Sequence, residues 1–274
     1  MAVITLTTDM GDRDYYVAAL KGAVLRRLPD ARLIDISHKI SPFDIAQASF
    51  VIRNVYREFP EGTIHIIGIN PDRVKRLSPF DMRDEVKHVI VEKEGHYFIG
   101  ADNGIFSLLF DEAPERIFEI TVDTGYNPEV FPVKNVFIPI ACDLAQGKMP
   151  EELGFPMDSI HERAIFRPVV EQNMIKGTVI YIDTYGNVIT NITRDLFEKI
   201  KGDRDFTLYF RSEDYEITEI SGSYGEVPEG EKVALFGSSG HLEIAINRGV
   251  EGSGGGASSL FGLKLNDTIR IEFQ

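Results

Sequence analysis

The chain has 274 residues, a hydrophobic content of 43%, a charged content of 26% and a formal net charge of −14. These values are typical of a globular protein with room for one large domain or two ordinary ones. The acidic balance and the lack of any basic block along the sequence argue against a nucleic-acid or anionic-membrane surface, because clustered Lys and Arg side chains bind phosphates.

Cysteine content and hydropathy restrict the class of protein further. Cys142 is the only cysteine, so no intrachain disulfide forms and no cysteine metal cluster is expected. The N-terminus shows no signal peptide, and no apolar run reaches membrane-spanning length. We therefore predict a cytoplasmic protein without a membrane partner or a bound metal.

The first elements are a strand, an acidic turn and a helix. Residues 3–7 are β-rich, Asp9 to Asp12 form a turn, and residues 16–21 have a helical pattern with Asp14 at the position of an N-cap. This is the first half of a βαβ unit, and ligands of open α/β sheets bind beyond the carboxyl ends of strands. Asp9 is therefore a candidate ligand for a ribose diol. The alternative is that Asp9 only caps the following helix.

The α/β pattern continues to about residue 150. Asp102-Asn103-Gly104 is a turn that opens a helix, and the alternation of strands and helices predicts a mostly parallel sheet. The remaining predicted elements are strands at 32–36 and 62–69, a hairpin of 88–92 with 95–100, and helices at 45–59 and 138–146.

A second pattern follows an irregular connector. Short strands with turns between them predict a small antiparallel barrel-like domain. They are expected at 175–182, 188–192, 205–210, 216–220, 232–235, 242–246 and 267–273. With the boundary near residues 160–172, we predict an α/β domain over 1–165 and an all-β domain over 170–274.

Four loops collect polar residues. They are Thr8-Asp9, residues 70–73, residues 182–187 and residues 237–241. Each loop alone is explained by turn chemistry, as when Gly186 and Asn187 adopt positive φ in a hairpin. As a set, however, they indicate a binding site.

The loops lie in stretches that resemble a known family. The stretches are TTDMGDRDYYVAALKG, DISHKISPFDIAQASFVI, GTIHIIGINP, ADNGIFS, IDTYGNVITNI, GSSGHLEIAINRG and LFGLKLNDTIRIEF. Their order and spacing resemble the S-adenosylmethionine (SAM) hydroxide adenosyltransferases, or SAM hydrolases, which are related to the fluorinases and chlorinases.

The resemblance implies a fold, a partner and a reaction. It implies an N-terminal α/β domain, a C-terminal barrel-like domain, and a homotrimer in which SAM binds between the N-terminal domain of one subunit and the C-terminal domain of the next. It also implies that a nucleophile attacks C5′ of the SAM ribose and that methionine leaves as a neutral group, without any further cofactor.

The resemblance assigns substrate-binding roles to residues of both domains. In the first domain, Asp9 holds the ribose hydroxyls, Asp14, Tyr15 and Tyr16 flank the substrate, and Phe43 lies near the reaction centre. Phe131, also in the first domain, is a further substrate-binding candidate. In the second domain, Asp183 and Asn187 bind the methionine amine and carboxylate, and Tyr185 stacks on adenine. Ser238 and Ser239 contact the amino-acid end, Glu243 pairs with the ammonium, and the backbone of Asn247 and Arg248 contacts the adenine edge.

The water-activating group of the family does not match. SAM hydrolases carry an Asp where this chain has Asn70, an Arg where it has Leu77, and a His where it has Pro132. Asn70 can orient water but cannot accept a proton at neutral pH. Asp72 lies nearby, and Arg76 fits only if the loop slips by one residue. The candidate catalytic residues are therefore Asn70, Asp72 and Arg76.

Three functions remain open from the sequence. The first is a SAM hydrolase with a rearranged nucleophile site, which gives adenosine and methionine. The second is a SAM- or adenosine-binding protein with impaired catalysis. The third is an adenosyl transfer to a different nucleophile.

Overall fold

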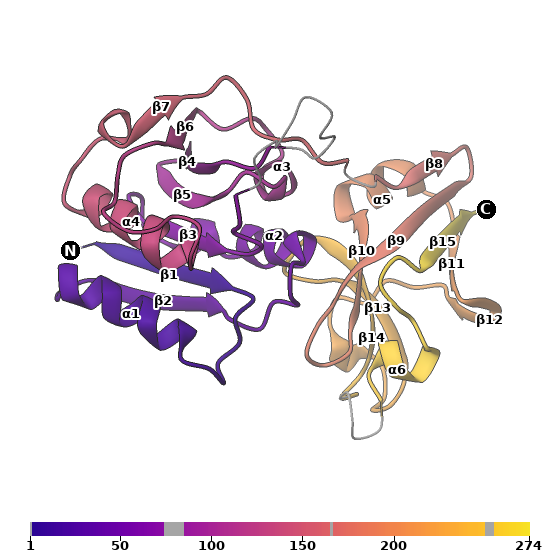
Figure 1. Cartoon of the computed structure of the whole chain (residues 1–274). Helices are drawn as coiled ribbons and strands as arrows, with labels where there is room; N and C mark the ends of the chain where they lie inside the picture. The colour runs from indigo at the N-terminus through magenta and orange to yellow at the C-terminus, as the bar shows by residue number, and fades with distance from the viewer. Residues whose placement is uncertain (1, 74–84, 165–166, 250–254) are drawn as a thin grey trace. The chain divides into compact units, whose positions relative to one another are not determined.

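The computed structural model describes residues 2–73, 85–164, 167–249 and 255–274. The chain divides into two compact units, residues 1–164 and 165–274 (Figure 1). Each unit has its own sheet and its own hydrophobic core. Within the described residues, no helix is both long enough and apolar enough to cross a membrane.

The first unit is built on a seven-stranded sheet of order β2-β1-β3-β5-β4-β6-β7. Its strands are β1 (Val3–Thr8), β2 (Arg32–Ser37), β3 (Ile64–Gly68), β4 (His88–Lys93), β5 (His96–Ala101), β6 (Arg116–Ile120) and β7 (Gly154–Pro156). Its helical elements are α1 (Tyr16–Arg27), α2 (Ile45–Arg53), η1 (Tyr56–Glu58), α3 (Ile105–Leu109), η2 (Val133–Phe137), α4 (Ile138–Ala145) and η3 (Pro150–Glu152).

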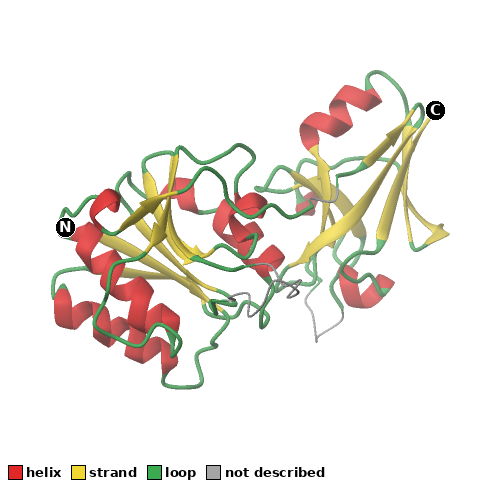
Figure 2. Ribbon diagram, turned by 45° about the horizontal axis from the view of Figure 1, so that its top comes forward, coloured by secondary structure: helices red, strands yellow, loops and turns green. Residues whose placement is uncertain are grey.

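Helices cover both faces of this sheet (Figure 2). On one face, Leu20 of α1 and Ala141 of α4 pack with Ile4 and Leu6 of β1. On the other face, Ala48 and Ile52 of α2 belong to a second core. A sheet that is buried on both faces explains why its central strands are continuous apolar runs.

The sheet is only partly parallel. The prediction of a mostly parallel sheet is wrong for the half that contains β4, β6 and β7. β1 pairs in parallel with β2 and β3, and β3 pairs in parallel with β5. β4, β6 and β7 join by antiparallel pairs. The cause is the predicted hairpin, in which Glu94 and Gly95 both have positive φ (51° and 75°), as a tight antiparallel turn requires.

Two helix predictions need correction. Asp14 does not cap α1, because the N-cap is Tyr15 and no side chain makes a capping hydrogen bond there. The helix predicted over 45–59 is α2 only to Arg53, followed by the short η1. The start of α2 follows the expected chemistry, since Asp44 Oδ1 accepts from the Gln47 N–H (2.9 Å).

The second unit is a nearly closed antiparallel barrel-like sheet of order β12-β11-β15-β9-β10-β14-β13, as predicted. Its strands are β8 (Val169–Glu171), β9 (Met174–Ile182), β10 (Val188–Thr193), β11 (Phe206–Phe210), β12 (Ser212–Ile217), β13 (Lys232–Phe236), β14 (His241–Ile246) and β15 (Thr268–Phe273). One continuous core contains side chains from β9, β10, β11, β13, β14 and β15.

The second unit is not purely β. It also contains α5 (Arg194–Lys201), η4 (Tyr224–Glu226) and α6 (Ala257–Phe261), which the sequence analysis did not predict. The start of α5 has an identifiable signal, because the hydroxyl of its N-cap Thr193 accepts from the Leu196 N–H (3.3 Å).

Candidate functional site

The N-terminal candidate residues gather at the carboxyl ends of the parallel strands. In the β1–β3 pairing Thr8 lies opposite Gly68, so Asp9 and Asn70 follow neighbouring strand ends. β1 lies between β2 and β3 in the sheet. The chain passes from β1 to β2 on one side and then crosses over to β3 on the other side of β1, so the strand order reverses at β1. This is a topological switch point, the place where open α/β sheets bind ligands.

Asp9 is held by the loop that follows β2. Its Oδ2 accepts a hydrogen bond from the Phe43 N–H (2.9 Å). Asp9 does not cap α1, so the capping alternative is wrong. Within the described residues its Oδ1 has no hydrogen-bond partner, and this oxygen remains available as an acceptor.

Backbone strain is concentrated on candidate site residues. Seven non-glycine residues of the described chain have positive φ, and four of these were site candidates from the sequence: Phe43 (66°), Asn70 (44°), Phe131 (50°) and Arg248 (58°). A bulky residue in this region is a steric outlier, and such outliers cluster at ligand sites. The Phe43 side chain is also 68% exposed, which a scaffold role does not require.

Three aromatic side chains form a patch in the first unit. The Tyr15 and Tyr16 rings lie 4.5 Å apart, and the Phe131 ring meets Tyr16 edge-on at 5.5 Å. Tyr15 is 68% exposed. Aromatic faces of this kind suit a nucleoside.

The start of η2 lies directly over the strand ends. A Cβ on Gly68 would lie 2.8 Å from Val133 Cγ2 and 3.2 Å from Thr8 Cγ2, so this contact needs a glycine. Pro132, which stands where the resemblance expects a His, is the buried residue at the N-cap of η2. The two departures at Asn70 and Pro132 therefore lie beside the same edge of the sheet.

The turn at Asn70 is held from beneath by two residues that the sequence analysis did not select. Asn103 Nδ2 donates to the carbonyl oxygens of Ile69 and Asn70, at 3.1 Å each. His88 Nε2 lies 2.7 Å from the Pro71 carbonyl oxygen and donates to it. Burial lowers the pKa of His88 to about 4, so this ring is neutral near pH 7.

The side chains of the two described catalytic candidates reach solvent. Asn70 and Asp72 are both exposed. Arg76, and Leu77 beside it, lie outside the described residues. Arg73 follows Asp72 and is the described cation of this loop. Its Nη2 donates to the Ile120 carbonyl oxygen (2.8 Å), so its side chain points toward the end of β6.

In the second unit the loop between β9 and β10 is organised by Asp183. Asp183 Oδ1 accepts from the N–H groups of Tyr185 (2.9 Å) and Asn187 (2.8 Å), and Oδ2 accepts from Asn187 Nδ2 (3.0 Å). Gly186 has a φ of 78°. The carboxylate therefore has a structural role, yet Oδ2 keeps acceptor capacity, and the Tyr185 ring is 61% exposed.

Glu243 is a buried carboxylate near this loop. It is 6% exposed, and its Oε1 accepts from the hydroxyl of Tyr224, a residue that the sequence analysis did not select. A Cβ on Gly237 would lie 2.7 Å from Oε2, so the β13–β14 turn passes directly against it. Burial raises the pKa of Glu243, and the carboxylate of Asp183 acts in the same direction.

The remaining candidates flank Glu243 in the sequence. Ser238 is exposed and Ser239 is half-buried in the turn that begins at Gly237. Beyond β14, Asn247 Nδ2 donates to the Val227 carbonyl oxygen (2.7 Å), and Arg248 lies 2.8 Å from Glu229. The side chains of Asn247 and Arg248 are thus held within their own unit, which leaves backbone contacts as their expected role.

Comparison with known proteins identifies the family of the chain. Residues 4–154 match the SAM hydroxide adenosyltransferase N-terminal domain, and residues 177–270 match the SAM hydroxide adenosyltransferase C-terminal domain. The chain therefore belongs to the SAM hydroxide adenosyltransferase family.

Individual relatives fall into the same group. The chain is 31% identical over 199 residues to a (R)-S-adenosyl-L-methionine hydrolase of Methanocaldococcus jannaschii, covering 70% of this chain and 68% of the relative. It is 29% identical over 277 residues to a fluorinase of Nocardia brasiliensis, covering 89% and 90%. The crystal structure of an uncharacterized conserved protein from Thermotoga maritima superposes with a TM-score of 0.83 at 28% identity, covering 98% of this chain and 99% of that one.

Proposed function

We propose that the protein is a SAM hydrolase, in which water or hydroxide attacks C5′ of SAM and releases adenosine and L-methionine. The observation that carries this proposal is the match of both halves of the chain to one SAM-cleaving family. The free oxygen of Asp9 at the switch point supports it, because a carboxylate there accepts from ribose hydroxyls.

The binding roles divide between the two units. Asp9 anchors the ribose, and the patch of Tyr15, Tyr16 and Phe131, together with the exposed Phe43, excludes water from the nucleoside. In the second unit, Tyr185 stacks on adenine. Methionine is bound there by five residues: Asp183, Asn187, Ser238, Ser239 and Glu243. The backbone of Asn247 and Arg248 contacts the adenine edge, and Asp14 of the first unit flanks the substrate.

Glu243 is the residue we assign to the methionine ammonium. Within the described residues it has no cationic partner, and burial raises its pKa. A substrate ammonium supplies the missing positive charge and stabilises the ionised carboxylate. This assignment explains why a carboxyl group is kept buried beside Asp183.

The chemical step demands little from general acid catalysis. The sulfonium of SAM leaves as a neutral thioether, so the protein has to place water in line with C5′ and remove a proton. Asn70 orients the water and Asp72 is the candidate base. Arg76, which lies outside the described residues, is the candidate cation if the loop slips by one residue. Since an exposed Asp72 is a weak base, we expect slow turnover.

The second candidate function is a SAM- or adenosine-binding protein with impaired catalysis. Asn70 and Pro132 favour it, because both replace groups that the resemblance expects to activate water. An adenosyl transfer to another nucleophile is the third candidate.

A homotrimer and a cytoplasmic location form part of the same proposal. They rest on the family resemblance, and the single buried cysteine is compatible with a reducing compartment. Light scattering after gel filtration tests the assembly, with an expected mass of three chains of 30.8 kDa. A monomer that turns over SAM contradicts the trimeric site.

The experiment that separates the functions is incubation of the purified protein with SAM, with adenosine and methionine measured by liquid chromatography. Stoichiometric release of both products supports hydrolysis. No release, together with a rise in melting temperature on adding SAM or adenosine, supports the binding protein. Neither turnover nor stabilisation contradicts both.

A further inference from the structure

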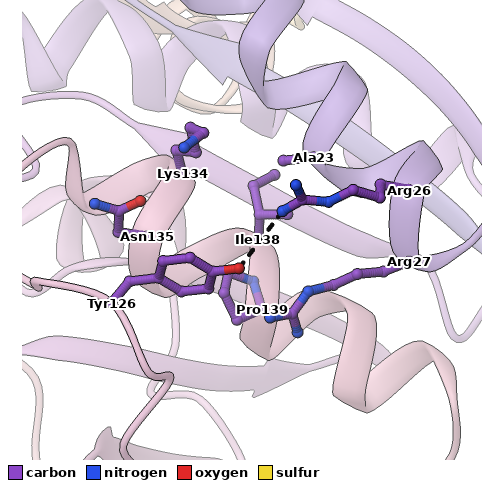
Figure 3. Close-up of a pocket in the computed structure, with 8 residues that line it drawn as sticks. All are labelled: Ala23, Arg26, Arg27, Tyr126, Lys134, Asn135, Ile138 and Pro139. Atoms are coloured by element: carbon purple, nitrogen blue, oxygen red, sulfur yellow. Dashed lines mark hydrogen bonds between the residues drawn. The ribbon is translucent and has the colours of Figure 1, made fainter.

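A basic groove lies on the surface of the first unit, between α1 and the helical run formed by η2 and α4 (Figure 3). Three cations line it: Arg26 and Arg27 from the last turn of α1, and Lys134 from η2. Tyr126, from the segment after β6, reaches over the groove with its hydroxyl toward the arginines. We call this set of four residues the basic groove.

The described part of the chain supplies no carboxylate that pairs with the cations of the basic groove. Arg26 Nη2 lies 3.5 Å from the Tyr126 hydroxyl oxygen. Within the described residues none of the three cations pairs with a carboxylate, whereas Lys21, on the same helix, pairs with Asp35. A chain with 43 acidic and 29 basic residues has ample carboxylates for such pairing, so this local excess of positive charge is unexpected.

The lowered pKa of Tyr126 reflects the same local positive charge. A hydrogen bond from Arg27 lowers the pKa of the Tyr126 phenol, and the charges of Arg26 and Lys134 act in the same direction. A phenol becomes more acidic where its anion is stabilised. The site therefore already favours a negatively charged oxygen at the position of the hydroxyl.

Helix electrostatics account for only part of this arrangement. Cations in the last turn of α1 stabilise the negative end of its dipole, which explains Arg26 and Arg27. Lys134 belongs to a different helical element, and Tyr126 to a loop. The dipole gives no reason for these two residues to converge on the arginines.

We propose that the basic groove binds a phosphate-type oxyanion, either inorganic phosphate or the phosphoryl group of a small monoester. Arginine guanidinium groups match the geometry of phosphate oxygens, and Lys134 and the Tyr126 hydroxyl add further donors. Arg26 lies ten residues along α1 from Tyr16, about 15 Å in a helix, so the arginines lie away from the aromatic patch, while Lys134 follows Phe131 of that patch by three residues. The inference does not depend on SAM cleavage.

The test is calorimetric titration of the full-length protein at low ionic strength with two probes, inorganic phosphate and ribose 5-phosphate. We expect saturable one-site binding of at least one probe. The tighter probe shows whether free phosphate or the ester is recognised. No saturation of either probe up to about 10 mM, which corresponds to a binding free energy weaker than about −3 kcal/mol, overturns the proposal.

A matched pair of variants makes the site assignment specific. The double variant Arg27→Gln, Lys134→Gln removes two charges from the groove. The control Arg32→Gln, Lys199→Gln removes two exposed charges elsewhere. We expect the groove variant to weaken binding at least about tenfold and the control less than about threefold. Equal weakening in both variants overturns the proposal.

The variant Tyr126→Phe gives a second answer if the double variant does not fold. It keeps every charge and the aromatic ring, so stability is retained. We expect about threefold to tenfold weaker phosphate binding, in line with the loss of one hydrogen bond. Unchanged affinity in this variant contradicts the role of the hydroxyl and, where the double variant is unfolded, overturns the proposal.

Discussion

The Asp9 carboxylate accepts the backbone N–H of Phe43 at 2.9 Å through Oδ2. This contact ties the loop after β2 to the end of β1, so Asp9 orders the site as well as offering its other oxygen to a ligand. A test of Asp9 has to separate these two roles.

The variant Asp9→Asn separates them. The amide oxygen still accepts from Phe43, while the amide nitrogen cannot accept from a ribose hydroxyl. We expect an unchanged melting temperature and adenosine affinity lowered about tenfold to a hundredfold, equivalent to about 1.5–3 kcal/mol for a charge-assisted hydrogen bond. The control is Asp12→Asn, since Asp12 is exposed and its one ion pair among the described residues is with Lys39. Equal affinity loss in both variants contradicts a specific ribose anchor.

The turn at Asn70 gives the second prediction. Asp and Asn both tolerate the left-handed backbone found there (φ 44°), so Asn70→Asp is expected to fold normally. The new carboxylate is a proton acceptor, and we expect kcat for SAM hydrolysis to rise about tenfold or more, below the ~10²–10⁴ of a fully formed general base. Steady-state kinetics measure this. A lower kcat in this variant shows that proton removal at residue 70 does not limit the reaction.

The exposed carboxylate of Asp72 gives the third prediction. If it removes the proton from water, Asp72→Asn lowers kcat about tenfold or more and leaves KM nearly unchanged. Glu85, which is also exposed and acidic, provides the control Glu85→Gln. Retention of full activity in Asp72→Asn assigns proton removal to solvent.

Much of the fold was predictable because its signals are local. Strand ends, the hairpin of 88–92 with 95–100 and the helix over 138–146 all follow from short-range chemistry, although the hairpin turn lies at Glu94-Gly95, one residue beyond the predicted Lys93-Glu94. The antiparallel β4–β5 hairpin was predicted, whereas the antiparallel β4–β6 and β6–β7 pairs were missed because they join segments distant in sequence. α5 was missed although Thr193 caps it, because the surrounding strand pattern outweighed a helix of only eight residues.

For the candidate site, the sequence suggested positions but not their contacts. Asp9, Phe43, Asn70 and Phe131 follow from motif spacing, and positive φ at the last three agrees with special positions. The supporting residues were not predictable. Asn103 and Tyr224 act through hydrogen bonds across long sequence separations, to Asn70 and to Glu243 respectively, and neither carries a local signal.

The pair of Tyr224 and Glu243 gives the fourth prediction. Tyr224→Phe removes the donor to a buried carboxyl group, and we expect a loss of about 1–3 kcal/mol in the free energy of unfolding. The measurement is urea denaturation near pH 7. Tyr215→Phe is the control, because Tyr215 stacks on Phe210 and its hydroxyl makes no hydrogen bond to any residue that the structure describes. A Tyr224→Phe protein as stable as the control shows that Glu243 is satisfied in another way.

Buried histidines give the fifth prediction. Burial lowers the pKa of His65 to about 3 and that of His88 to about 4, from an ordinary value of 6.5. Between about pH 4 and pH 6.5, the folded state therefore binds fewer protons at these two histidines than the unfolded state does. The stabilisation is fully present above pH 6.5 and is lost as pH falls toward 4. Near pH 5 the contribution of these two histidines to the slope of the unfolding free energy against pH approaches two protons, or about 2.7 kcal/mol per pH unit.

Denaturation curves from pH 7 to pH 4.5 measure this slope. His88→Gln is expected to reduce this slope by about one proton. A slope that is the same in His88→Gln and in the unsubstituted protein contradicts a neutral, buried His88.

The central claim, attack of water at C5′ of SAM, is tested most directly by running the reaction in ¹⁸O-labelled water and analysing the products by mass spectrometry. The account predicts adenosine that carries one ¹⁸O at the 5′-hydroxyl and methionine without label. Unlabelled adenosine, or methylthioadenosine in its place, would contradict it.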